Sequence, residues 1–308
     1  MKHGATVRSV PPVAAETWLM LPFGGGRRCL WRAEGAAACR LLEFLRAATG
    51  LPEGGAPVAE APGCELFSGL PVPAGRINCR CRDLDASIDP ESGLVRCFLT
   101  GEPDSPVRFG RAARMLFFFG LLPELLSGKL LLGHGALAVR EGRGVLFCGP
   151  SGIGKSTAVS RLPEDWEVLG DDCFLLSESG GSWFVQPAPT WSIWISGKPF
   201  RRFDCSHRVE LGRVFLVERG PGKIAPLSYP AALSGWMPSF ADMIRWHLPA
   251  GFDSLRRRLM SRAFERVAPL ARRVPPELLQ LTLEEGPRAV FKAETVAMVK
   301  RNDAAIMK

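Results

Sequence analysis

One stretch of this chain, Gly149-Pro150-Ser151-Gly152-Ile153-Gly154-Lys155-Ser156, matches the pattern G-x-x-x-x-G-K-[ST] at every fixed position. That pattern is typical of loops that cradle the phosphates of a nucleotide. Its glycines let the backbone curl so that successive N–H groups point inward, and the helix that follows presents the positive end of its dipole. The stretch therefore predicts a phosphate-binding loop (P-loop), with ATP and Mg²⁺ as the expected ligands.

The residue types in and beside this loop suggest roles for its members. Lys155 is expected to reach the β- and γ-phosphates, and the Ser156 hydroxyl is expected to bind Mg²⁺. The other expected nucleotide contacts are Gly149, Ser151, Gly152, Ile153, Gly154 and Thr157. A P-loop lies between a buried strand and a helix, and here 144–148 is apolar while 157–162 favours a helix. A glycine-rich turn without function would not need these two flanks.

Two acidic residues, Asp171 and Asp172, end the next predicted strand, 166–169. P-loop enzymes need a carboxylate near Mg²⁺, and a second one can accept the proton of an attacking hydroxyl. The alternative is a polar turn after a strand, where Asp is common. Upstream, His134 precedes Gly135, and a single histidine taken alone is more often structural than catalytic.

The remaining pattern predicts an α/β fold in two parts. The first, residues 1–110, reads as a small α+β domain that could bind a substrate or partner; the second, residues 111–308, reads as the nucleotide-binding catalytic domain with a helical C-terminal part. In the first part we expect strands within 17–32, 77–82 and 94–100, a helix at 36–49 and a loop at 51–73. In the second part we expect a buried helix at 115–126, strands at 130–139, 145–148, 166–169, 173–176, 183–185 and 214–217, and helices from 231, with a basic amphipathic one at 252–272.

Composition narrows the function classes. The chain has 308 residues, a formal net charge of +8 and 46% hydrophobic residues, which is ordinary for a soluble globular protein. Its basic residues form no long run, so we expect no nucleic-acid partner.

The apolar stretch 115–126 is too short to span a bilayer, and no secretory signal is visible, so we expect no membrane association and a cytoplasmic location. The nine cysteines, Cys79 and Cys81 included, are expected to be reduced thiols.

Taken together, His134-Gly135, the loop 149–156 and Asp171-Asp172 resemble the catalytic domain of HPr kinase/phosphorylase and its relatives, over roughly residues 130 to 220. The resemblance implies the fold core that these kinases share with phosphoenolpyruvate carboxykinases. It also implies that Asp171 is the general base, that Asp172 and Ser156 hold Mg²⁺, and that His134 lies by the phosphates or by Asp171.

One departure from that family concerns the substrate. HPr kinases carry a segment E-[IV]-R-G-[LIV]-G downstream, which we do not find here. In its place stand Pro189-Thr190-Trp191-Ser192 and a strand-like run, 209–218. This arrangement is similar to the HPr-kinase-related proteins of peptide-modification gene cassettes, of the SynChlorMet cassette protein ScmC type. The resemblance implies a peptide or protein substrate rather than HPr.

Three functions are compatible with these signals. The first is an ATP-dependent kinase that transfers the γ-phosphoryl group to a Ser or Thr hydroxyl, with a homo-oligomer left open. The second is a nucleotide-binding regulatory or scaffold protein without phosphoryl transfer. The third is a small-molecule enzyme like the carboxykinases, which would need His207 or His247 near the phosphates. Arg201, Arg202 and Arg208 could steer an acidic substrate, although an exposed basic face explains them as well.

Overall fold

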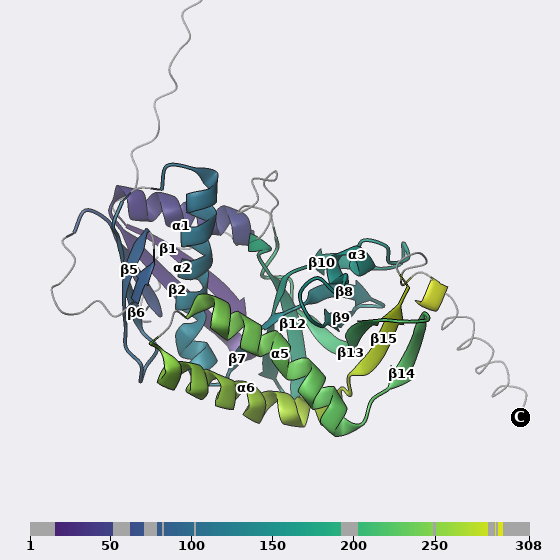
Figure 1. The fold of residues 1–308 in the computed structure, drawn as a ribbon. Coiled ribbons are helices and arrows are strands. Elements are labelled where there is room, and N and C mark those ends of the chain that lie inside the picture. The colour runs from purple at the N-terminus through teal and green to yellow at the C-terminus, as the bar shows by residue number, and fades with distance from the viewer. Residues whose placement is uncertain are drawn as a thin grey trace, which may run out of the picture.

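The computed structural model describes residues 16–51, 62–70, 79–81, 83–101, 103–191, 203–248, 251–282, 287 and 289–291. Over these residues the chain forms a mixed α/β structure with two β-sheets (Figure 1). None of the helices in the described part is both long and apolar enough to cross a membrane.

The first sheet has six strands in the order β1-β2-β3-β6-β5-β4. Its strands are β1 (Glu16–Phe23), β2 (Arg27–Glu34), β3 (Cys64–Phe67), β4 (Cys79–Cys81), β5 (Leu84–Ile88) and β6 (Val95–Leu99). The strands predicted within 17–32 are confirmed as β1 and β2, which are antiparallel and joined by the short 3₁₀ turn η1 (Gly24–Gly26). The predicted helix is confirmed as α1 (Ala36–Thr49), which ends at Gly50 in the left-handed conformation that glycine favours.

The structure of this first part differs from the sequence interpretation in two places. Residues 64–67, assigned to a loop, form β3, which pairs in parallel with both β2 and β6. The turn at 89–93 joins the antiparallel strands β5 and β6, and β5 was not predicted. Both strands are only four or five residues long, so their periodicity gives a weak signal.

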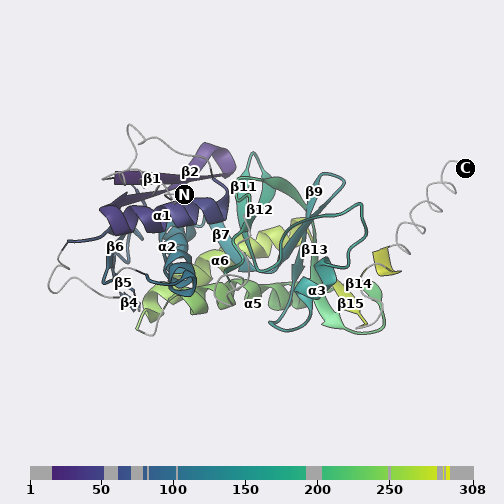
Figure 2. The same cartoon turned by 90° about the horizontal axis from the view of Figure 1, so that it is seen from above.

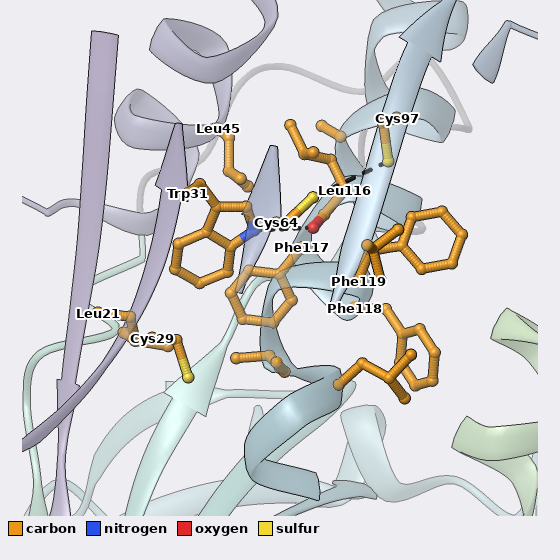
Figure 3. Packing of buried hydrophobic residues seen from close by; sticks show 14 of the residues in the cluster. Leu21, Cys29, Trp31, Leu45, Cys64, Cys97, Leu116, Phe117, Phe118 and Phe119 are labelled. Carbon is orange, nitrogen blue, oxygen red and sulfur yellow. Dashed lines mark hydrogen bonds between the residues drawn. The ribbon is translucent and has the colours of Figure 1, made fainter. Parts of the chain in front are cut away.

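A long helix, α2 (Pro106–Leu126), follows and is almost entirely buried along its second half. It starts earlier than predicted, because Pro106 occupies its first turn and the Ser105 hydroxyl accepts a hydrogen bond from the Arg108 backbone N–H. Trp31 of β2 lies across Gly120, where an added Cβ would stand 1.9 Å from the indole ring. The Trp31 indole N–H donates to the Leu116 carbonyl at 2.8 Å, as Figure 3 shows. Glycine at 120 thus lets the first sheet pack against α2.

The second sheet contains the strands around the predicted phosphate loop. They are β7 (Leu130–His134), β8 (Ala136–Arg140), β9 (Arg143–Cys148), β10 (Glu167–Gly170), β11 (Cys173–Ser179), β12 (Ser182–Ala188), β13 (Val209–Arg219), β14 (Lys223–Pro226) and β15 (Glu277–Leu281). The main path runs β10-β8-β9-β13-β12-β11-β7, with β15 parallel to β13 and β14 antiparallel to β15. The strand predicted at 130–139 is instead two strands in different positions, and β15 interrupts a tail predicted to be mostly helical.

Three helices complete the described part: α3 (Lys155–Val159), α5 (Tyr229–His247) and α6 (Asp253–Arg273). Helices α5 and α6 pack against each other, and α6 also contacts α2. The apolar stripe of α6, which includes Leu255, Leu259 and Val267, is buried in the fold. Packing within the chain therefore accounts for the stripe predicted at 252–272.

The largest hydrophobic core is continuous across both sheets. It contains residues of β1, β2 and α1, the buried length of α2, parts of β7 and β11, and residues of α5 and α6. The proposed division at residue 110 falls inside α2, which contacts both the first sheet and β7.

The described cysteines other than Cys81 are free thiols and all of them are buried: Cys29, Cys39, Cys64, Cys79, Cys97, Cys148, Cys173 and Cys205. Burial raises the pKa of Cys29, Cys173 and Cys205 well above the ordinary thiol value. It raises the pKa of Cys148 to about 12. The Sγ atoms of Cys64 and Cys97, on the neighbouring strands β3 and β6, lie 3.9 Å apart (Figure 3).

Candidate functional site

One edge of the second sheet brings the predicted site residues together. Strand β8 is antiparallel to both β9 and β10, so β9 and β10 run in the same direction and end at the same edge. Pairing of Gly170 with Leu137 and of Phe147 with Ala136 fixes this alignment. The loop after β9 and the acidic pair after β10 therefore leave the sheet side by side.

The same edge receives His134. Strand β11 is antiparallel to β7, and Cys173 pairs with His134. The Gly135 backbone N–H donates to the Asp172 carbonyl at 3.0 Å. A side chain at Gly135 would meet the Phe147 carbonyl and the Phe174 ring, each 2.9 Å from the added Cβ. The His134-Gly135 pair thus sits where the chain crosses from β7 to β8 in close contact with the base of the loop.

The loop after β9 has the backbone conformation that its glycines permit. Gly152 and Gly154 have φ values of 79° and 105°, and a Cβ on either would meet nothing within 4 Å. At Gly149, by contrast, a Cβ would stand 3.0 Å from the Val217 carbonyl. The short helix α3 then begins at Lys155, so the predicted order of strand, loop and helix is present.

Lys155 is directed back into the loop. Its side chain is buried, and Nζ donates to the carbonyls of Gly149 at 2.8 Å and Pro150 at 3.0 Å. Burial lowers the pKa of Lys155, while the neighbouring Cys148, Asp172 and Asp242 act in the opposite direction. The ammonium group is therefore a cation with little solvent contact, held inside the loop.

The acidic pair Asp171-Asp172 contacts residues of three other segments of the chain. The Ser156 hydroxyl donates to the Asp171 backbone carbonyl at 3.4 Å. The Thr190 hydroxyl donates to the Asp171 carboxylate, with Oγ1 and Oδ1 2.7 Å apart. The Asp172 carboxylate approaches a different residue, since its Oδ1 is 3.4 Å from His134 Nδ1.

His134 is buried but has unused hydrogen-bonding capacity. Neither of its ring nitrogens makes a hydrogen bond with any described residue. Its ring packs edge to face against Trp246 of α5, with centroids 4.9 Å apart. A buried polar group without a partner is uncommon and costs stability unless a ligand or water satisfies it. Apart from the 3.4 Å approach of Asp172 to Nδ1, the imidazole is therefore open to a ligand at this edge.

Three residues of this site had no role in the sequence interpretation. Thr190 belongs to the Pro189–Ser192 segment, which was noted as a difference from HPr kinases but not connected with Asp171. Asp242 lies on α5, where it accepts a hydrogen bond from Arg245 at 2.6 Å and raises the pKa of Lys155. Trp246 lies one turn further along α5. The last two are some ninety residues from the loop, and no local pattern marks them.

Of the two histidines proposed for a carboxykinase-like metal site, His207 lies just before β13 and His247 directly follows Trp246 on α5. His247 is buried, stacks on Phe118 with centroids 4.7 Å apart, and bonds through Nδ1 to the Met243 carbonyl at 2.7 Å. Burial lowers its pKa to about 4, which keeps the ring neutral at pH 7.

Of the arginines considered for an acidic substrate, Arg208 lies over the Phe184 ring on β12. Arg201, Arg202 and Ser192 lie outside the described residues.

The donors at this edge suit Mg²⁺ bound together with a nucleotide. Mg²⁺ prefers oxygen ligands and is usually held by one or two carboxylates, a hydroxyl and the phosphates of the substrate. Ser156 and Asp172 supply a hydroxyl and a carboxylate at the same edge, and both are accessible to solvent at least in part. Their chemistry fits the ion that the sequence predicts.

Comparison with known proteins agrees with the resemblance seen in the sequence. A family model described as "SynChlorMet cassette protein ScmC" matches residues 123–287, which is more than half of the chain. The chain belongs to the ScmC family. The matched region starts in the last turn of α2 and contains every residue of the edge described above.

Other comparisons are more distant. No curated protein matches the chain. Among solved structures, the chain is similar to the Hpr(Ser) kinase/phosphatase from Coxiella burnetii, with 11% sequence identity and a TM-score of 0.30. That match covers 57% of this chain and 97% of the other. A likeness at this level supports no further argument about this ScmC-family chain.

Proposed function

We propose that this chain is an ATP-dependent phosphotransferase that transfers the γ-phosphoryl group to a Ser or Thr hydroxyl of a peptide or protein. The observation that carries the proposal is the convergence of Lys155, Ser156, Asp171, Asp172 and His134 at one edge of the second sheet. These residues come from three separate segments of the chain. A glycine-rich turn without function would not need a buried lysine, two carboxylates and an orphaned imidazole beside it.

Each group has a task in such a reaction. The backbone N–H groups of the loop 149–156 and the Lys155 ammonium would bind the phosphates. Ser156 and Asp172 would hold Mg²⁺, which neutralises charge on the phosphates when it is bound. His134, between Asp172 and Trp246, would donate a hydrogen bond to a phosphate oxygen.

Asp171 would accept the proton of the attacking hydroxyl. Its Oδ1 is held by the Thr190 hydroxyl, and among the described residues no hydrogen bond engages Oδ2. A carboxylate with one oxygen fixed and the other available is suited to a general base, because its orientation is set before the substrate arrives. Catalysis by this site would consist of positioning and charge stabilisation, as in other phosphoryl transfers.

The family name suggests where the acceptor is to be sought. The matching family is described as a cassette protein, and we propose that the acceptor is a peptide or protein encoded in the same cassette. We further propose that residues 1–110 contribute to binding this acceptor, that the enzyme uses ATP and Mg²⁺, and that it acts in the cytoplasm.

The test follows label from [γ-³²P]ATP into a peptide and protein fraction in the presence of Mg²⁺. The wild-type chain should transfer label, and Asp171→Asn should reduce transfer at least a hundredfold while Mg-ATP affinity changes by no more than a few-fold. Asp165→Asn is the matched control, because Asp165 is an exposed carboxylate paired with Arg140 outside the site. Full transfer by Asp171→Asn would exclude the role assigned to this residue.

A second variant tests the loop itself. Lys155→Ala should weaken Mg-ATP binding, measured by calorimetry, whereas Lys223→Ala on the exposed end of β14 should not. Nucleotide binding without label transfer to any acceptor would favour the regulatory or scaffold function over the kinase. Equal ATP affinity of Lys155→Ala and wild type would contradict the phosphate-loop assignment.

A further inference from the structure

A polar groove lies at the opposite end of β11 from the candidate site. It has a volume of about 370 Å³ and is lined by the start of β2, the turn after α2, the β11–β12 turn and one face of α6. Its charged members are Arg27, Lys129, Glu178 and Arg266. We call it the junction groove, because Arg27 belongs to the first sheet and Glu178 to the second. The hairpin turn that precedes Arg27 contacts β11, and Figure 2 shows the two side by side.

The junction groove is separate from the candidate phosphate site. Strand β11 starts at Cys173, directly after Asp171-Asp172, and ends at Ser179, which lines the groove. The seven residues of this extended strand span about 20 Å. A ligand in the groove would therefore not touch the loop 149–156.

The charges of the groove do not cancel. Arg266 and Glu178 form an ion pair with each other, and the Arg266 guanidinium also lies over the Trp183 ring at 5.0 Å. Arg27 and Lys129 are exposed, and no described carboxylate forms an ion pair with either of them. The groove thus presents two uncompensated positive charges beside a neutralised pair.

The walls between these charges are made of small and polar residues. Gly180 and Gly181 form the β11–β12 turn with φ values of 58° and 79°, and a Cβ on either would meet nothing within 4 Å. Ser127 and Ser179 add hydroxyl groups. Exposed backbone and hydroxyl groups in the same groove as two cations are the kind of surface that anions bind.

We propose that the junction groove binds a small dianion, a phosphate monoester or a dicarboxylate, between Arg27 and Lys129. Two positive charges without partners match two negative charges on the ligand. Arg266 and Glu178, which line the same groove, neutralise each other. Because Arg27 is on the first sheet and Lys129 precedes β7 of the second, the bound dianion links the two sheets and raises the thermal stability of the chain.

The experiment measures binding of two probes, inorganic phosphate and succinate, by calorimetry at constant ionic strength, together with the melting temperature. The wild-type chain is expected to bind at least one probe with a saturable rise in melting temperature. In a Lys155→Ala background, which removes phosphate binding at the loop, Arg27→Ala and Lys129→Ala should each weaken binding about tenfold, and the two together should abolish it. Arg257→Ala is the matched control, because Arg257 is exposed on α6 but does not line the groove.

The Lys155→Ala background separates the groove from the phosphate loop. Phosphate binding that survives in Lys155→Ala but not when both groove substitutions are added supports the proposal. Preference for phosphate or for succinate identifies the kind of dianion. The proposal is overturned if neither probe binds, if adding both groove substitutions leaves binding unchanged, or if only an acidic peptide such as hexaglutamate binds, which would make the groove a protein-docking surface.

Discussion

Thr190 is the residue that links an unassigned sequence segment to the chemistry of the site. Its hydroxyl donates to Asp171 Oδ1 at 2.7 Å, and its side chain is buried. A hydrogen bond to a charged group contributes about 1.5–3 kcal/mol. Because Thr190 would orient Asp171 without touching the nucleotide, its loss should affect the reaction and not ATP binding.

We therefore expect Thr190→Val to lower the rate of label transfer by about tenfold or more, with Mg-ATP affinity unchanged. Thr190→Ser keeps the hydroxyl and should restore most of the rate. The measurements are the initial rate of transfer from [γ-³²P]ATP and the calorimetric Kd of Mg-ATP. An equal loss in the Val and Ser variants would mean that packing, and not the hydrogen bond, is what matters at this position.

His247 gives the fold a defined sensitivity to acid. Burial lowers its pKa from 6.5 to about 4, so the unfolded chain binds a proton more readily than the folded chain. Stability should therefore fall as the pH drops below about 6.5, and the contribution of His247 should be fully lost below about pH 4. A pKa difference of this size corresponds to about 3 kcal/mol.

The check is urea unfolding of wild type and His247→Gln between pH 7 and pH 4. Wild type should lose about 3 kcal/mol more over this range than the variant, which cannot be protonated. His207→Gln is the matched control, since it removes a histidine that is only partly buried. Parallel pH curves for wild type and His247→Gln would contradict this expectation.

At the scale of elements, the break between β7 and β8 shapes the site. The two strands are separated by Gly135 alone, and they occupy distant positions in the sheet order. Because the chain crosses from β7 to β8 at this point, His134 lies at the end of β7. The base of the loop 149–156 lies beside the start of β8. Residues 130–139 are apolar apart from Gly133, His134 and Gly135, which is why the sequence predicted one strand.

Gly135→Ala should be destabilising, because the added Cβ would lie 2.9 Å from the Phe147 carbonyl and the Phe174 ring. Overpacking of this kind typically costs about 1–3 kcal/mol. Gly101→Ala is the control, since a Cβ there would meet nothing within 4 Å. Urea denaturation measures both. Equal stability of the two variants would show that the β7–β8 crossing adapts without cost.

Features carried by contiguous residues could be predicted from the sequence. The glycine-rich loop, the acidic pair and the helix α1 depend on local spacing, and all are placed as expected. The strands β3 and β5 were too short to give a pattern. Thr190, Asp242 and Trp246 reach the site through strand order and helix packing, which depend on contacts between distant segments and leave no local signal.

At the scale of the whole molecule, the largest hydrophobic core contains residues of both sheets. Helix α2 packs against α1 and the first sheet on one side and against β7 and α6 on the other. Two units joined by a buried helix cannot separate without exposing that helix to water. Unfolding of either sheet should therefore destabilise the other.

We expect a single cooperative transition on unfolding by urea. Curves recorded by far-ultraviolet circular dichroism and by tryptophan fluorescence should coincide, because Trp31 reports on the first sheet and Trp236 on the second. Two resolved transitions would mean that the division near residue 110 separates independent folding units.

The buried cysteines have a practical consequence for such experiments. Cysteine reacts with alkylating reagents as the thiolate, and burial holds Cys29, Cys148, Cys173 and Cys205 both protonated and out of reach. Cys29 lies in the first sheet and Cys148 directly before the loop of the second. Mass-spectrometric readout of which cysteine is alkylated first would therefore show where the native molecule opens, using groups that the chain already carries.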